Sequence, residues 1–146
     1  MLGFLYIASQ FAGALIGVIF SKIFYNNRTI DLDVSENLLQ ALLLEILGSF
    51  FLVFMYLSST EEKTKFTKDK AVQTIILAGS YLGAMLIAGV KLEKLDASPV
   101  NPAIAIAIFF VNASSNSFKS IWIFGGASLI GSFLSLMFFS FVYKKT

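Results

Sequence analysis

Residues 99–110 read Pro-Val-Asn-Pro-Ala-Ile-Ala-Ile-Ala-Ile-Phe-Phe, an Asn-Pro-Ala triplet that opens a short apolar segment. A helix made from this segment would be about 15 Å long, half the thickness of a bilayer core, at about 1.5 Å rise per residue. Longer apolar segments lie on both sides of it in the sequence. The pattern therefore predicts a re-entrant half-helix over residues 102–111, and such elements lie where they line a cavity or are buried in protein.

The composition predicts an integral membrane protein. The 146-residue chain is 57% hydrophobic and 14% charged, with a mean hydropathy of +0.80. Soluble domains carry about 25% charged residues. The sequence has no Cys and no His, which excludes thiol chemistry and the commonest metal ligands, so we expect no metal and no cofactor. The net charge of +2 gives no reason to expect a nucleic-acid partner.

Apolar stretches long enough to cross a bilayer occupy residues 2–24, 38–57, 71–90 and 120–143. With the half-helix they predict one membrane domain over residues 1–146. The expected fold is all-α and integral to the membrane, with four transmembrane helices and one re-entrant half-helix. Pairs of small residues four positions apart predict close helix contacts. These pairs are Gly13 with Gly17, Gly79 with Gly83, and Ala127 with Gly131.

The distribution of basic residues predicts the orientation. An even number of crossings places residues 58–70 and the C-terminus on the same side as the N-terminus. Cytoplasmic loops are enriched in Lys and Arg, so six Lys against five basic residues favours both termini inside. The six are Lys63, Lys65, Lys68, Lys70, Lys144 and Lys145, and the five are Lys22, Arg28, Lys91, Lys94 and Lys119.

The Asn-Pro-Ala triplet suits a helix start, because Asn is a good N-cap and Pro fits the first helical position. An ordinary helix start would need the same residues. If this helix begins near the bilayer midplane, its amino end places a partial positive charge there. Asn101 could then offer an amide donor to a solute, while the field repels cations. The expected pore residues from this pattern are Asn101, Pro102 and Ala103.

Polar residues inside the spans are further candidates. Glu45 lies near the middle of the second span, where an unpaired carboxylate is costly. Its expected partners are backbone N–H groups of the re-entrant loop, and the alternative is a protonated structural acid. Gln10 and Gln73 are expected to form inter-helix hydrogen bonds, and Gln10 to support the loop together with Glu45. No second carboxylate, His or nucleophile is placed to act with Glu45, so we expect no enzyme.

With these residues identified, the chain resembles the aquaporin family, the major intrinsic proteins, over nearly its whole length. Residues 6–14 are similar to the third membrane helix of the family, residues 45–50 to the start of the fourth, and residues 71–90 to the fifth. Asn101-Pro102-Ala103 corresponds to the second signature triplet, and Trp122 followed by residues 127–131 resembles the sixth helix. The resemblance implies a channel for water or small neutral solutes.

The chain also departs from the family pattern. It looks like the third helix plus the second repeat, without the first two helices and the first Asn-Pro-Ala half-helix. The family usually has an Arg of the selectivity filter directly after the second triplet, so the resemblance implies that Ile104, which stands there, is a further pore residue. The family also has a Pro where this chain has Ser128. One half-helix supplies one dipole where the family barrier uses two, so we expect no conduction by the isolated monomer.

Three functions stay open at this point. The first is a channel component for water or small neutral solutes, incomplete without a partner chain that supplies the missing helices. The second is a non-conducting structural subunit of a larger membrane complex that keeps a degenerate aquaporin-like fold. The third is a fragment of a complete channel. In each case the expected partners are the lipid bilayer and other membrane polypeptides.

Overall fold

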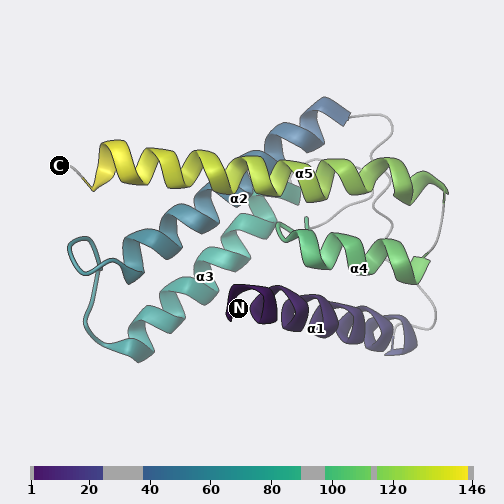
Figure 1. The fold of residues 1–146 in the computed structure, drawn as a ribbon, viewed down its shortest axis with the longest axis horizontal. Helices are drawn as coiled ribbons and strands as arrows, with labels where there is room; N and C mark the ends of the chain where they lie inside the picture. Colours follow the sequence, from purple (N-terminus) through teal and green to yellow (C-terminus); the bar gives the residue numbers. More distant parts are fainter. Residues whose placement is uncertain (1, 25–37, 90–97, 113–114, 145–146) are drawn as a thin grey trace.

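The computed structural model describes residues 2–24, 38–89, 98–112 and 115–144, and these are helical apart from two connections (Figure 1). The helices are α1 (Leu2–Phe24), α2 (Leu38–Thr60), α3 (Lys70–Gly89), α4 (Pro102–Asn112) and α5 (Ser115–Phe138), and a π-helical segment, η1 (Phe139–Tyr143), extends α5. Stretches long and apolar enough to cross a membrane are Leu2–Phe24, Leu38–Thr60, Lys70–Gly89 and Ile121–Tyr143. The protein therefore has an all-α integral membrane fold.

The largest difference from an expected span is at the start of α5, and α2 also continues to Thr60, three residues beyond the expected end at residue 57. α5 begins at Ser115, five residues before the apolar stretch that starts at residue 120. Polar residues outside the bilayer core can continue a helix, because the backbone hydrogen bonds that form it do not require an apolar sequence. The apolar stretch therefore marks the crossing and not the full helix.

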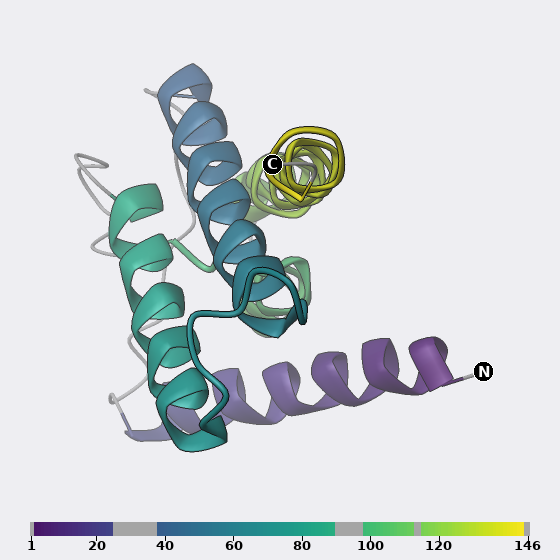
Figure 2. The same cartoon turned by 90° about the vertical axis from the view of Figure 1, so that its left-hand side faces the viewer.

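α2 is the central helix of the bundle. It packs against α5 on one side and α3 on the other (Figures 1 and 2). α4 lies against α5 and α1, and among the described elements α1 contacts only α4. Figure 2 shows the amino-terminal end of α1 extending away from the other helices. α2, α3 and α5 thus form the packed part of the fold, and α1 is attached to it through the short helix α4.

Small residues allow α2 to approach its neighbours closely. A Cβ atom on Gly131 would overlap the carbonyl oxygen of Ile46 and lie 2.9 Å from the Cβ of Ser49. On the other face of α2, a Cβ on Gly48 would lie 2.8 Å from the carbonyl oxygen of Ala84. The close contact predicted from the pair ending at Gly131 is therefore confirmed.

The described chain forms no close contact at the first glycine pair. No described atom lies within 4 Å of a Cβ built on Gly13 or Gly17, and the same holds for Gly79. Gly83 makes only an ordinary contact, 3.6 Å from the ring of Phe51. Small residues permit a close approach, but which helix arrives depends on the rest of the packing.

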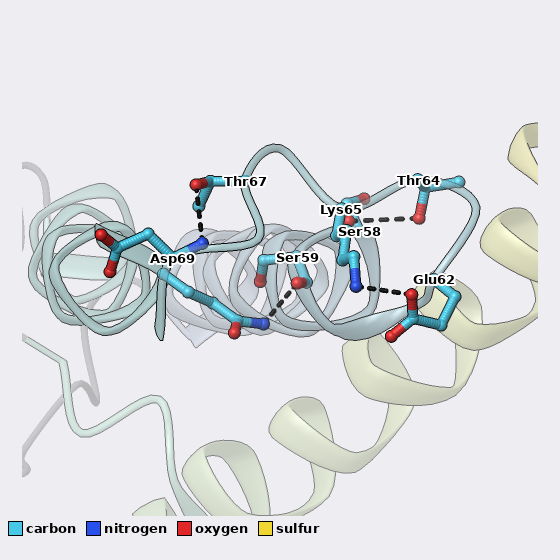
Figure 3. A network of polar contacts seen from close by, with 8 residues as sticks. Ser58, Ser59, Glu62, Thr64, Lys65, Thr67 and Asp69 are labelled. Atoms are coloured by element: carbon cyan, nitrogen blue, oxygen red, sulfur yellow. Dashed lines mark hydrogen bonds and ion pairs between the residues drawn. The ribbon is translucent and has the colours of Figure 1, made fainter. Parts of the chain in front are cut away.

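The connection between α2 and α3 is ordered by side-chain hydrogen bonds to the backbone (Figure 3). The Thr64 hydroxyl donates to the carbonyl oxygen of Ser58 at 3.1 Å. The Gln73 side-chain amide of α3 donates to the carbonyl oxygen of Ser59, so its expected inter-helix hydrogen bond is present. Asp69 caps the amino end of α3. These bonds close the end of the bundle that carries the charged connection.

The π-helical extension of α5, η1, packs against the carboxyl-terminal part of α2. The ring of Phe54 lies 5.1 Å from that of Tyr143, which lies 5.6 Å from that of Phe139. Beyond the rings, the Lys144 ammonium lies 3.2 Å from the Glu61 carboxylate. Aromatic contacts of this geometry are favourable, and the exposed ion pair adds little.

Candidate pore-lining site

The turn that precedes α4 is held inside the bundle. The backbone N–H of Ser98 donates to the carbonyl oxygen of Met85 at 3.2 Å, and the Tyr81 hydroxyl donates to that of Pro99 at 3.4 Å. Tyr81 is the twelfth of the 20 residues of α3, so these contacts lie within the helix and not at its start. The turn before α4 therefore lies beside the second half of α3 and inside the helical bundle.

Glu45 fixes the same turn from α2. Its carboxyl group is fully buried and is hydrogen-bonded to the hydroxyl of Ser98 through Oε2 and to that of Ser128 through Oε1, the latter at 2.7 Å. The backbone N–H of Val100 also donates to this carboxyl. One side chain thus joins α2, the turn and α5, and it supplies acceptors that lipid cannot provide.

The two serines were not identified from the sequence as partners of Glu45. A serine inside an apolar helix carries no signal of which side chain it will meet, and Ser98 lies outside every predicted helix. The available signal was Ser128 itself, which stands where the resembled family has a Pro. A hydroxyl at that position supplies a hydrogen-bonding group that Pro lacks.

Backbone strain marks the last residue before the triplet. Val100 is buried and has a φ of 48°, in the left-handed region that β-branched residues rarely adopt. Such a conformation costs about 1–3 kcal/mol and persists only where the surroundings enforce it. The contacts of Ser98, Pro99 and Val100 itself enforce it here. The chain reversal at Val100 directs the following residues into α4.

Asn101 caps α4 with its side-chain oxygen. Oδ1 accepts a hydrogen bond from the Ala103 N–H at 2.9 Å, and the Asn101 carbonyl oxygen accepts from Ile104 and Ala105 at 3.1 Å each. Pro102 occupies the first helical position, where its missing N–H costs nothing. Since Oδ1 is used by the cap, Nδ2 is the group of the Asn101 amide that is left to donate to a solute.

Asn101 and Ile104 line a groove of about 450 Å³ between α4 and α1. The α1 wall consists of small, apolar and polar residues, namely Gln10, Gly13, Ala14, Gly17, Val18 and Ser21. Gln10 therefore lies in the same groove as the triplet. Gly13 and Gly17 face this groove, and no described atom lies within 4 Å of a Cβ built on either of them.

α1 and α4 run in the same direction along the groove. Gln10 shares the groove with Asn101 near the amino end of α4, and Lys22 reaches its carboxyl end. The half-buried Lys22 ammonium donates to the carbonyl oxygen of Val111 at 3.2 Å. A cation at this position complements the negative end of the helix dipole.

A second groove, of about 350 Å³, lies on the α5 side of α4. Its walls are almost wholly apolar and include Pro102, Trp122, Gly125 and Gly126. No described atom lies within 4 Å of a Cβ built on either glycine. In the described ranges no group of three or more His, Cys, Asp or Glu residues could hold a metal ion. The side chains that line the two grooves beside α4 therefore offer amide, hydroxyl, indole and apolar groups.

These features define a polytopic helical membrane protein in which a half-length helix begins within the bundle and borders a groove. A family model described as Major intrinsic protein matches residues 1–139. The chain belongs to this family, and the resemblance seen in the sequence is confirmed at the level of the family. No curated protein and no solved structure matches the chain significantly.

Proposed function

We propose that this chain forms part of an aquaporin-like channel that conducts water or small neutral solutes along the groove between α1 and α4. Membership of the major intrinsic protein family supports a channel for solutes of this kind. The observation that carries the proposal is the placement of Asn101. It stands at the amino end of a short helix inside the bundle, lines the groove, and uses Oδ1 for its own cap.

The groove suits a neutral solute. The Nδ2 group of Asn101 donates to a solute oxygen, and the positive end of the α4 dipole disfavours a cation at the same level. The next turn presents Ile104, an uncharged side chain that packs with Val18 against the core. The wall beyond Asn101 therefore offers few polar contacts, which favours small or less polar solutes over ions.

The groove needs a further wall to become a closed path. Its lining residues come from α1 and from the amino-terminal part of α4, so the opposite side is open in the described chain. We propose that other membrane polypeptide, on a partner chain or on additional sequence, supplies that wall. The unpacked faces of Gly13 and Gly17 give such a segment room to approach.

The test is the osmotic and solute permeability of vesicles that contain the chain in the complex isolated from its membrane with mild detergent. Asn101→Asp is the informative variant. Asp is as good an N-cap as Asn, so the bond to the Ala103 N–H survives, while the donor Nδ2 becomes a carboxylate oxygen. We expect wild-type permeability above that of empty vesicles and a large loss in Asn101→Asp at unchanged thermal stability.

The second candidate function is a non-conducting structural subunit. The observation that favours it is α1, which in its described range Leu2–Phe24 has no buried residue and leaves its glycine face open. Under this function the wild-type complex and Asn101→Asp would both match empty vesicles. Replacing Gly13 and Gly17 by Leu would instead release the chain from its complex.

A further inference from the structure

The hydroxyl of Ser128 has two acceptors and one proton. Its Oγ is hydrogen-bonded to Oε1 of Glu45 at 2.7 Å and also to the carbonyl oxygen of Phe124 in the preceding turn of α5. A carboxylate and a carbonyl oxygen both accept only, and a serine hydroxyl donates a single hydrogen bond. An ionised Glu45 would therefore compete with Phe124 for the same proton.

A proton on Oε1 of Glu45 removes this competition. The acid then donates to Ser128, and Ser128 donates to the carbonyl oxygen of Phe124. On the rest of the carboxyl group, Ser98 still donates to Oε2 and the backbone N–H of Val100 keeps its hydrogen bond, because a protonated acid still accepts at its carbonyl oxygen. Every hydroxyl proton in the chain of bonds now has one acceptor. We propose that Glu45 is a neutral acid whose shared proton joins α2 to α5, with Ser98 and Ser128 as residues that position the turn before α4.

The surroundings of Glu45 support a neutral group. Glu45 and Ser98 are 0% exposed and Ser128 is 1% exposed. In the described ranges the ion pairs are Lys65 with Glu62 and Lys144 with Glu61, so no described cation pairs with Glu45. A buried carboxylate without a cation is strongly unfavourable, and in practice such groups take up a proton.

The arrangement positions the turn because it joins three elements at one carboxyl group. Glu45 belongs to α2 and Ser128 to α5, and Ser98 lies three residues before Asn101. Hydrogen-bond networks in a low-dielectric interior rigidify a site when every member is satisfied. Loss of the Ser128 hydroxyl leaves the Glu45 proton without its acceptor and frees one side of the carboxyl group.

The protonation state can be read by infrared spectroscopy of the purified chain at neutral pH. We expect the wild-type-minus-Glu45→Gln difference spectrum to show the C=O stretch of a protonated carboxylic acid. Ser128→Ala should shift this band toward weaker hydrogen bonding, and Ser128→Thr should restore its position. A carboxylate band in place of the acid band would overturn the proposal. If Glu45→Gln does not fold, the shift in Ser128→Ala identifies the band.

The role of Ser128 in positioning the turn before α4 can be tested by a measurement made next to that turn. The chain has no cysteine, so Ile104→Cys introduces a unique thiol beside Asn101. We expect its reaction rate with a small thiol reagent to change several-fold in Ser128→Ala and to return in Ser128→Thr. Ser132→Ala is the matched control, because Ser132 bonds the Ser128 carbonyl oxygen at 2.7 Å and not Glu45. Equal rates in both alanine variants would overturn the role. Neither readout depends on conduction.

Discussion

Replacing Gly131 by Ala should force α2 and α5 apart. The new methyl group would overlap the carbonyl oxygen of Ile46 and lie 2.9 Å from the Cβ of Ser49. Carbon atoms in good contact lie about 3.5–4.0 Å apart, so the helices must separate by about 0.6 Å or more at this level. Neither neighbour can rotate away, because one is a backbone carbonyl and the other a Cβ atom.

The cost of this change can be bounded. Overpacking a close contact costs about 1–3 kcal/mol, and the higher helix propensity of Ala returns up to about 1 kcal/mol. We therefore expect Gly131→Ala to lower the free energy of unfolding by about 1–2 kcal/mol. The assay is unfolding of the purified chain in mixed micelles with increasing SDS, followed by circular dichroism.

Gly126→Ala is the matched control on the same helix. No described atom lies within 4 Å of a Cβ at Gly126, so the methyl group meets no neighbour there. Only the propensity gain of up to about 1 kcal/mol remains, and this variant should be as stable as the wild type or more so. If Gly131→Ala unfolds at the same SDS content as Gly126→Ala, the close approach of α5 to α2 is not as described.

Two further predictions concern helix ends. Asp69→Ala removes Oδ1, which accepts hydrogen bonds from the N–H groups of Ala71 at 2.8 Å and Val72 at 3.3 Å. The loss of this cap should destabilise the start of α3 by about 0.5–2 kcal/mol, whereas Asp69→Asn should stay near wild type because Asn is an equally good cap. Hydrogen exchange of the first-turn amides of α3 measures this loss, and equal protection in the Ala and Asn variants would refute the cap. Lys22→Met removes the bond to the Val111 carbonyl oxygen and a charge–dipole contribution of about 0.3–1 kcal/mol. The amides in the last turn of α4 should then exchange faster while global unfolding changes little, and unchanged exchange would show that Lys22 does not hold α4.

The helices could be predicted because their signals are local. The long apolar stretches are found as helices that are long and apolar enough to cross a membrane, and the Asn-Pro start of the shorter stretch coincides with the start of α4. Helix starts depend on neighbouring residues alone, through the cap and the fixed φ of Pro. The extension of α5 to Ser115 was missed because helix length outside the bilayer does not follow hydropathy.

The contacts between helices were predictable only in part. A carboxyl group in the middle of a span must find donors, so a partner in the re-entrant turn could be expected for Glu45. The identity of that partner depends on how α2, α5 and the turn meet, which spacing along one helix does not specify. The same limit explains Gly13 and Gly17, whose spacing matches that of Ala127 and Gly131 although they line a groove and no described atom lies within 4 Å of a Cβ built on them.

The turn before α4 and the α1 wall of the groove are held in different ways, so the support of the turn is separate from the solute path proposed above. Glu45 of α2 and Tyr81 of α3 bond the turn directly, and Ser128 of α5 bonds Glu45. By contrast, α1 reaches the described bundle through α4 alone. A displacement of α1 therefore changes the width of the groove without breaking any described hydrogen bond to the turn. Since Asn101 is fixed by the turn, its donor keeps its place when the groove widens or when another segment packs on α1. We therefore expect a segment that completes the proposed path to bind on the α1 side without disturbing the turn before α4.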